Sequence, residues 1–282
     1  MTSLQALLLS LLQGATEFLP VSSSAHLVLA QRLFHLKGNN LAFDVLVHVG
    51  TMLSILLVFR TRLLDLVAFA LAEGWRMTAR EGVKKAWTVD PRGRMIVAIL
   101  LATIPTGAIA LVAKDFFEGL FMAPDKIGWA LCITGMLLAS TVLRRPHPDD
   151  RPGRPATAED PPFPLWAAFA IGIMQGIAVA PGISRSGSTI AVALLLGLRR
   201  KQAWEFSFLI SIPAILGALI LETKDLTTGA SVSLPTGILS LVTACVVGWV
   251  CLKVLQRVVR GGQFPFFSLY CFAVGIWAIL WF

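Results

Sequence analysis

Charged residues are scarce in this chain. Asp, Glu, Lys and Arg make up only 14% of the 282 residues, whereas about 25% is usual in soluble domains. Hydrophobic residues make up 56%, and the mean hydropathy is +0.76. These proportions exclude one or two ordinary soluble domains and indicate an all-α polytopic membrane protein.

Cysteine is also rare, and its spacing excludes a metal site of the zinc type. The four cysteines lie in apolar segments without ligand spacing, which favours buried thiols over a metal site or a disulfide. They are Cys132, Cys245, Cys251 and Cys271.

The net charge of +8 does not indicate nucleic-acid binding. The basic residues are spread among loops without aromatic interleaving, so no nucleic acid is expected as a partner. Residues 60–94 hold eight Lys or Arg, 144–164 hold four, 199–201 hold three and 253–263 hold three. The positive-inside rule places these four segments on the cytoplasmic side.

Six apolar runs are long enough to cross a bilayer as helices. They cover residues 41–59, 93–113, 126–143, 202–222, 235–252 and 264–282. Between Leu63 and Arg80 the apolar pattern is interrupted by Asp65, Glu73 and flanking arginines. This pattern predicts an amphipathic helix on the inner membrane surface rather than a seventh span.

Two further apolar segments are broken by a proline. Residues 3–36 break at Pro20 and residues 164–198 break at Pro181, and the second part of each is short for a crossing. Both segments are predicted to be re-entrant helical hairpins. Two full crossings per segment would satisfy the same loop charges.

The chain contains an internal repeat. Gln13-Gly14 recurs as Gln175-Gly176, 162 positions later, and Ala42-Phe43-Asp44 recurs as Ala203-Trp204-Glu205 at an offset of 161. One hairpin plus three spans is an odd number of crossings, so the second half must be inverted relative to the first.

The predicted domains follow from this repeat. The first repeat covers residues 1–143, a cytoplasmic linker covers 144–163, and the second repeat covers 164–282. The two hairpins then enter from opposite sides, and their breaks meet near the midplane.

Polar residues gather at both breaks. The first reads QGATEFLPVSSSAH (13–26) and the second QGIAVAPGISRSGST (175–189). Charged and hydroxyl groups at membrane depth need a partner or a water-filled cavity. Their concentration at two related places predicts a single functional site.

The second break resembles a phosphate-binding loop. A glycine-bearing loop that opens a helix presents free N–H groups and a positive dipole end to an anion, and the fork of Arg185 suits phosphate oxygens. It is not a P-loop, because the lysine and spacing of that motif are absent. The candidate phosphate-binding residues, one of them from the first break, are Ser22, Ser184, Arg185, Ser186 and Thr189.

The first break supplies groups for acid–base and metal chemistry. Ser23 lies one helical turn before His26, so His26 is a candidate base for an attack by Ser23 on phosphorus. The opposite assignment, with His26 as the nucleophile, fits the spacing equally well. Glu17 is a candidate to orient the imidazole or to bind a divalent cation.

Structural interpretations compete with these roles. Hydroxyls in membrane helices commonly bond to the backbone or to a neighbouring helix, and Asp44, His48 and Glu205 are explained as capping or packing residues. Glu17 and Arg185 differ, because burying an unpaired charge costs at least ~2.5 kcal/mol even on a permissive insertion scale. We assign these two to function.

The two motifs resemble those of a known family. QGATEFLPVSSSAH and PGISRSGSTIA, followed by AWEFSFL, are similar to the signature segments of bacterial undecaprenyl-diphosphate phosphatases, the bacitracin-resistance family. The resemblance covers essentially the whole chain. It implies a multi-pass protein of the bacterial inner membrane that removes the terminal phosphate of undecaprenyl diphosphate, with Mg²⁺ or Ca²⁺ as cofactor, and regenerates the carrier for cell-wall synthesis.

The resemblance also implies which residues act. The family's first-motif serine and histidine correspond to Ser23 and His26, and its second motif corresponds to Ser184 and Arg185, with Thr189 nearby. The expected catalytic residues are therefore Glu17, Ser23, His26 and Arg185, and Gln13 and Asp44 are secondary candidates. Because Gln13 occupies the first acidic position of the motif, Glu17 is its one carboxylate.

Further implications concern access and partners. The site is expected to open to the periplasm. Its expected partners are a polyprenyl diphosphate lipid, as substrate, and the surrounding membrane lipids. A homodimer is a further expected assembly. A lipid flippase or an anion transporter is the alternative function, because inverted repeats with broken helices are a transporter architecture.

Overall fold

The structure is a computed structural model, and it describes residues 1–36, 41–121, 123–144, 163–222 and 233–282. Within these ranges every regular element is a helix and there is no strand. The linker predicted over 144–163 lies almost entirely outside the described residues.

Six helices in the described ranges are long and apolar enough to cross a membrane, which confirms the six predicted spans. They contain α3 (Leu41–Ala68), α5 (Pro91–Val112), α7 (Pro124–Ser140), α10 (Arg200–Glu222), α11 (Leu234–Gly261) and α12 (Phe267–Trp281). The short element η3 (Thr141–Leu143) extends the span of α7, and η6 (Phe264–Phe266) begins the span of α12. The short helix α6 (Lys114–Phe121) lies between α5 and α7 in the chain.

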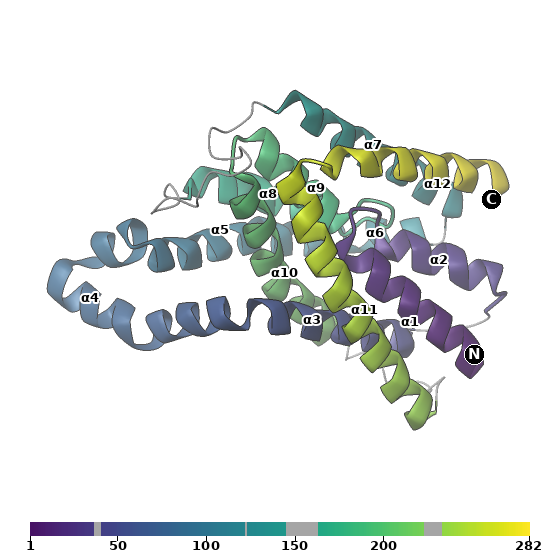
Figure 1. Cartoon of the computed structure of the whole chain (residues 1–282), viewed down its shortest axis with the longest axis horizontal. Helices are drawn as coiled ribbons and strands as arrows, with labels where there is room; N and C mark the ends of the chain where they lie inside the picture. Colours follow the sequence, from purple (N-terminus) through teal and green to yellow (C-terminus); the bar gives the residue numbers. More distant parts are fainter. Residues whose placement is uncertain (37–40, 122, 145–162, 223–232) are drawn as a thin grey trace.

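Four shorter helices form the two segments predicted as hairpins. They are α1 (Ser3–Phe18), α2 (Ser23–Leu33), α8 (Leu165–Ile177) and α9 (Arg185–Leu195). An α-helix of 11 residues, the length of α2 and α9, is only about 16 Å long, too short for a hydrocarbon core of ~30 Å. Within each pair the two helices pack against one another (Figure 1).

The backbone at the two breaks explains why the short helices end there. Pro20 and Pro181 each lack the N–H that a continuing helix needs. Ser22 has a positive φ of 67° and Gly182 one of 100°. A Cβ added at Gly182 would lie 2.5 Å from the Cβ of Ala130 and 2.7 Å from the carbonyl of Ile127, so only glycine fits this close approach.

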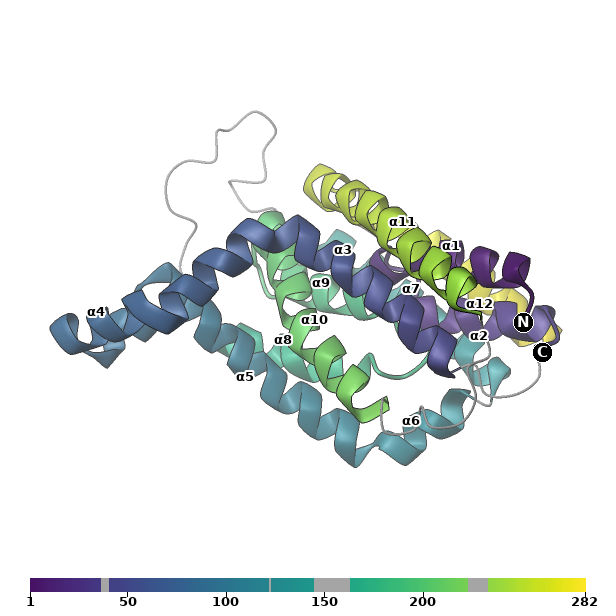
Figure 2. The same cartoon turned by 90° about the horizontal axis from the view of Figure 1, so that it is seen from below.

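The main helix contacts join the two halves of the chain. The α1 helix packs on α11, α8 packs on α5, and α7 packs on α12. Each of these pairs takes one helix from before residue 144 and one from after residue 163. The hydrophobic core is therefore shared between the halves, whose helices pack side by side in Figure 2. Pro20 and Pro181, at the two breaks, are both buried.

The α3 helix is longer than the sequence predicts. It continues through the π-helical turn η1 (Phe69–Glu73) into α4 (Gly74–Glu81), which gives one helix of 40 residues from Ala42 to Glu81. Figures 1 and 2 show α4 projecting beyond the bundle before η2 (Lys85–Val89) leads back to α5.

Leu63–Arg80 is therefore the continuation of α3 and not a helix of its own, and within the described residues it adds no seventh span, as the sequence predicts. Charged residues end an apolar run without ending a helix, since they have good helix propensity. Arg62 is accommodated in the continuous helix by ion pairs with Asp65, at 3.2 Å, and with Glu205, at 3.0 Å.

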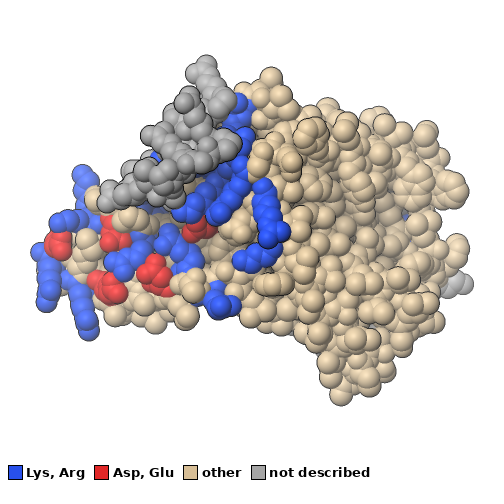
Figure 3. All heavy atoms as spheres, viewed as in Figure 1, with Lys and Arg blue, Asp and Glu red and all other residues tan. Residues whose placement is uncertain are grey.

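Charge is concentrated at one end of the molecule. On the face drawn in Figure 3, Lys, Arg, Asp and Glu side chains gather around the projecting end, and the opposite end shows almost none. Ion pairs tie part of this cluster together, among them Arg92 Nη1 to Glu73 Oε2 at 2.6 Å. The positive-inside rule associates such a charged end with the cytoplasmic side of a membrane.

Candidate active site

The two helix breaks lie against one another in the interior. The backbone N–H of Gly182 donates to Ser22 Oγ at 3.1 Å, and Ser186 Oγ donates to the carbonyl of Leu19 at 3.4 Å. Ser22 and Gly182 are 160 positions apart in the chain. The predicted meeting of the two polar segments is confirmed.

Glu17 lies at the centre of this junction. It occupies the last turn of α1, and its side chain is only 2% exposed. Gln13, one turn earlier on the same face of the helix, donates from Nε2 to Glu17 Oε2 at 3.0 Å. Ser23 Oγ donates to the same oxygen at 2.5 Å. Two neutral donors therefore hold one carboxylate oxygen in place.

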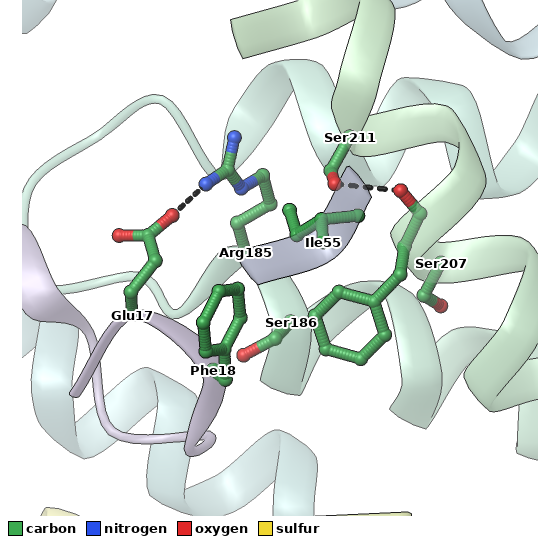
Figure 4. Close-up of a pocket in the computed structure, with 8 residues that line it drawn as sticks. Glu17, Phe18, Ile55, Arg185, Ser186, Ser207 and Ser211 are labelled. Carbon is green, nitrogen blue, oxygen red and sulfur yellow. Dashed lines mark hydrogen bonds and ion pairs between the residues drawn. The ribbon is translucent and has the colours of Figure 1, made fainter. Parts of the chain in front are cut away.

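Arg185 pairs with the other carboxylate oxygen. Its Nη2 donates to Glu17 Oε1, and Figure 4 shows the two side chains pointing toward one another. The Arg185 side chain is 26% exposed, so the guanidinium lies between the buried carboxylate and accessible space. A buried charge is tolerated when it is paired and hydrogen-bonded, as Glu17 is here.

The start of α9 fixes the position of Arg185. Ser184 is the N-cap residue, and its Oγ accepts from the backbone N–H of Gly187 at 3.1 Å. Thr134 on α7 braces the loop before it. The Thr134 hydroxyl donates to the carbonyl of Gly182 at 2.8 Å and accepts from the N–H of Ser184 at 3.0 Å. A lone threonine in an apolar span carries no signal of its own, so Thr134 was not predicted to lie at the site.

His48 is a second residue that sequence analysis did not place at the site. Its Nε2 lies 3.9 Å from Glu17 Oε2, and its side chain is 32% exposed. Its Nδ1 lies 2.7 Å from the carbonyl of Asp44, whose side chain accepts from Gln31 at 2.8 Å. The sequence feature that could have indicated a role for His48 is the presence of an ionisable residue inside an apolar run.

A cavity adjoins the Glu17–Arg185 pair (Figure 4). Its wall combines the ion pair and serine hydroxyls with apolar side chains. The lining residues are Glu17, Phe18, Ile55, Arg185, Ser186, Ser207, Phe208 and Ser211. The cavity therefore places the ion pair directly beside apolar side chains.

Comparison with known proteins identifies the family. Residues 6–277 match the family described as bacitracin resistance protein BacA. The chain belongs to this family.

Named relatives of this BacA-family chain are similar over nearly their full length. It is 39% identical over 280 residues to the undecaprenyl-diphosphatase of Carboxydothermus hydrogenoformans, an alignment that covers 98% of this chain and 96% of the relative. It is 43% identical over 278 residues to that of Desulfosudis oleivorans, with 98% and 97% covered. It is 36% identical over 272 residues to that of Korarchaeum cryptofilum, with 96% of each chain covered.

The predicted pairing of Ser23 with His26 is not present in this BacA-family structure. Ser23 donates to Glu17 instead. His26 is buried, and its two ring nitrogens lie 2.8 Å from the carbonyl of Ser22 and 2.8 Å from the hydroxyl of Tyr270. Both residues lie on α2, but each forms its hydrogen bond with a side chain of another helix, Ser23 with Glu17 and His26 with Tyr270.

The candidate phosphate-binding residues differ in what they contact. Thr189 and Ser184 are almost fully buried and bind within the protein, Thr189 to the carbonyl of Arg185 at 2.8 Å. Ser186 and Arg185 line the cavity. Ser22 bridges the two breaks, and Asp44 lies beyond His48 rather than against Glu17.

No group of three or more His, Cys, Asp or Glu that could bind a metal is found in the part of the chain that the structure describes. The four cysteines are free thiols, but only Cys271 is buried as the sequence predicts, since Cys132, Cys245 and Cys251 are partly exposed. Glu17 is the one carboxylate among the described residues that line the cavity.

Proposed function

We propose that this protein is an undecaprenyl-diphosphatase. It hydrolyses undecaprenyl diphosphate to undecaprenyl phosphate and inorganic phosphate, recycles the carrier for cell-wall synthesis and confers resistance to bacitracin. The observation that carries the proposal is the buried Glu17 carboxylate, which binds Ser23 on one oxygen and Arg185 on the other. These groups are a nucleophile, its base and an anion-binding side chain.

The reaction starts from the contact between Ser23 and Glu17. Ser23 Oγ attacks the terminal phosphorus while its proton moves to Glu17 Oε2, the oxygen to which it already donates. The bond between that phosphorus and the bridging oxygen breaks, and undecaprenyl phosphate leaves. Water then hydrolyses the phosphoserine and releases inorganic phosphate.

Arg185 stabilises the charge on the transferred phosphoryl group. Only Nη2 of its guanidinium contacts Glu17 among the described residues, so the other N–H groups can bind phosphate oxygens at the cavity. Such a preorganised donor is more effective in a site with apolar walls than in water. Phe18, Ile55 and Phe208 supply these walls.

A divalent cation, Mg²⁺ or Ca²⁺, fits the site as a companion of the substrate. Mg²⁺ is commonly bound by one or two carboxylates together with substrate phosphates and water. Glu17 is a single carboxylate beside the cavity, and Gln13 supplies an amide instead of a second one. When bound, the cation would neutralise charge on the diphosphate.

The inverted repeat is the architecture that we propose for this site. The paired short helices and the matching contacts of α1 with α11 and of α8 with α5 support two re-entrant hairpins related by pseudo-symmetry. In such a fold, irregular backbone at membrane depth is tolerated because it lies inside the protein or lines a cavity.

Access from the outer side is supported by the positions of polar groups. His48, Asp44 and Gln31 form a polar series that leads from Glu17 along α3 and α2. The series reaches the first turn of α3, at the end of this helix that is remote from α4 (Figure 1). In a bacterial cytoplasmic membrane that direction is the periplasm, and the polyprenyl tail would lie along apolar surfaces of the bundle.

The decisive experiment measures phosphate release by the purified protein from a polyprenyl diphosphate in detergent with Mg²⁺ or Ca²⁺. The matched control is Glu17→Gln, which keeps the shape of the side chain and removes its charge. The proposal predicts turnover by the wild type and almost none by the variant. A wild type without activity would refute it.

A lipid flippase or an anion transporter stays the second candidate because broken helices meet inside the bundle. Reconstituted vesicles separate the two functions. Movement of an uncleaved lipid or anion across the bilayer, without phosphate release, would favour the transporter.

A further inference from the structure

Tyr270 contacts the site from the far end of the chain. It is the single tyrosine of the sequence and lies in the first turn of α12. Its hydroxyl lies 2.8 Å from His26 Nε2, and its ring stacks on the imidazole with centroids 5.7 Å apart and an interplanar angle of 11°. A hydrogen bond and a ring contact between these two side chains therefore join α12 to α2.

The other ring nitrogen determines the direction of this hydrogen bond. His26 Nδ1 lies 2.8 Å from the carbonyl of Ser22, which can only accept. Nδ1 therefore carries the hydrogen, and the lone pair of the neutral imidazole is on Nε2. The hydroxyl of Tyr270 then donates to that lone pair.

Ser22 carries this contact on to both helix breaks. It holds a positive φ of 67°, a conformation that a non-glycine residue keeps only when its surroundings enforce it. Its carbonyl is bound by His26, and its Oγ accepts from the N–H of Gly182. Ser23, which donates to Glu17, is the next residue. The series of contacts runs from Tyr270 through His26 to Ser22 and Gly182.

We propose that Tyr270 is a positioning residue of the phosphatase reaction. Its hydroxyl fixes the ring of His26, and His26 in turn fixes the backbone that presents Ser23 to Glu17. The same hydroxyl occupies the Nε2 lone pair with which His26 would attack phosphorus, which favours Ser23 as the nucleophile of the proposed reaction. The assignment rests on the proposed phosphatase function.

The test variant is Tyr270→Phe. It removes the hydroxyl and keeps the stacked ring, and because Tyr270 is 45% exposed it leaves no buried void. We expect kcat to fall about 10-fold, the order of one hydrogen bond to a poised group, with KM within about twofold of wild type because no substrate contact is lost. The matched control is Trp277→Phe, a ring change on the same helix.

A spectroscopic measurement separates positioning from general destabilisation. The protein has four histidines and is labelled with ¹⁵N-histidine. The resonances that disappear from the spectrum of the His26→Gln variant are those of His26. The wild type should show an unprotonated, hydrogen-bonded Nε2, and Tyr270→Phe should shift that resonance while Trp277→Phe leaves it in place.

A lower kcat together with a shifted Nε2 resonance in Tyr270→Phe alone supports the proposal. Unchanged kcat in Tyr270→Phe overturns it, and so does an equal loss in Trp277→Phe. Failure of the phosphatase function is recognised separately, since the wild type would then release no phosphate while the Nε2 resonance still reports the contact with Tyr270.

Discussion

Removing the Arg185 side chain leaves the Glu17 carboxylate buried without its cationic partner. Glu17 is 2% exposed at its side chain, whereas Arg185 is 26% exposed. Breaking a buried pair by removing one partner typically costs about 3–5 kcal/mol. In Arg185→Ala, Gln13 and Ser23 still donate to Glu17. We therefore expect the free energy of unfolding to fall by about 3 kcal/mol, the lower end of this range.

The converse variant should be milder. In Glu17→Gln the guanidinium keeps access to solvent or to the cavity, and a neutral amide replaces the buried charge. We expect the free energy of unfolding of Glu17→Gln to fall by about 1 kcal/mol. The two variants should thus differ clearly in stability, although both lose the Glu17–Arg185 contact.

Their activities should fall together. Loss of a preorganised donor to a transition-state oxygen commonly lowers kcat by about 10²–10³-fold, and Glu17→Gln removes the proposed base altogether. Stability is measured by unfolding in mixed micelles of increasing denaturing detergent, and turnover by phosphate release. If Glu17→Gln were destabilised as strongly as Arg185→Ala, or if Arg185→Ala kept near wild-type turnover, the account of this ion pair would be wrong.

Three further predictions concern the nucleophile, the loop brace and the cation. Quenched turnover should trap a phosphorylated residue in wild type and His26→Ala but none in Ser23→Ala; mass-spectrometric mapping of the phosphate to His26 would contradict this. Thr134→Val should lower the unfolding free energy by about 2 kcal/mol, because the N–H of Ser184 and the carbonyl of Gly182 lose their partner; a change under ~0.5 kcal/mol would show that water replaces it. Chelation of divalent cations should stop phosphate release and added Mg²⁺ or Ca²⁺ should restore it, whereas unaffected turnover would exclude a cation requirement.

The spans and the polar breaks were predictable because their signals are local. Hydropathy locates a crossing from one run of residues, and a proline with polar neighbours inside an apolar run marks an interruption. The repeat of Gln13 and Gln175 related the two interruptions to one another. Burial cost then selected Glu17 and Arg185 from the many polar residues, and the ion pair between them confirms that these two residues lie together.

Helix length and hydrogen-bond partners were not predictable in the same way. The end of an apolar run at Arg60 does not end α3, because ion pairs with Asp65 and Glu205 stabilise Arg62 within a continuous helix. The spacing of Ser23 and His26 permits a contact that the structure does not contain. Spacing limits which side chains can meet, but rotamers and neighbouring helices decide which of them do.

The sequence by itself determined that this chain crosses a membrane, where its helices are interrupted, and that an acid and a guanidinium belong to one site, since each follows from the cost of placing polar groups in an apolar solvent. Only the tertiary structure decided that Ser23 donates to Glu17, that Thr134 braces the loop before Arg185, and that Tyr270 binds His26. These contacts join elements up to 244 positions apart. They depend on how helices from the two halves pack, and a linear pattern of residues does not contain that information.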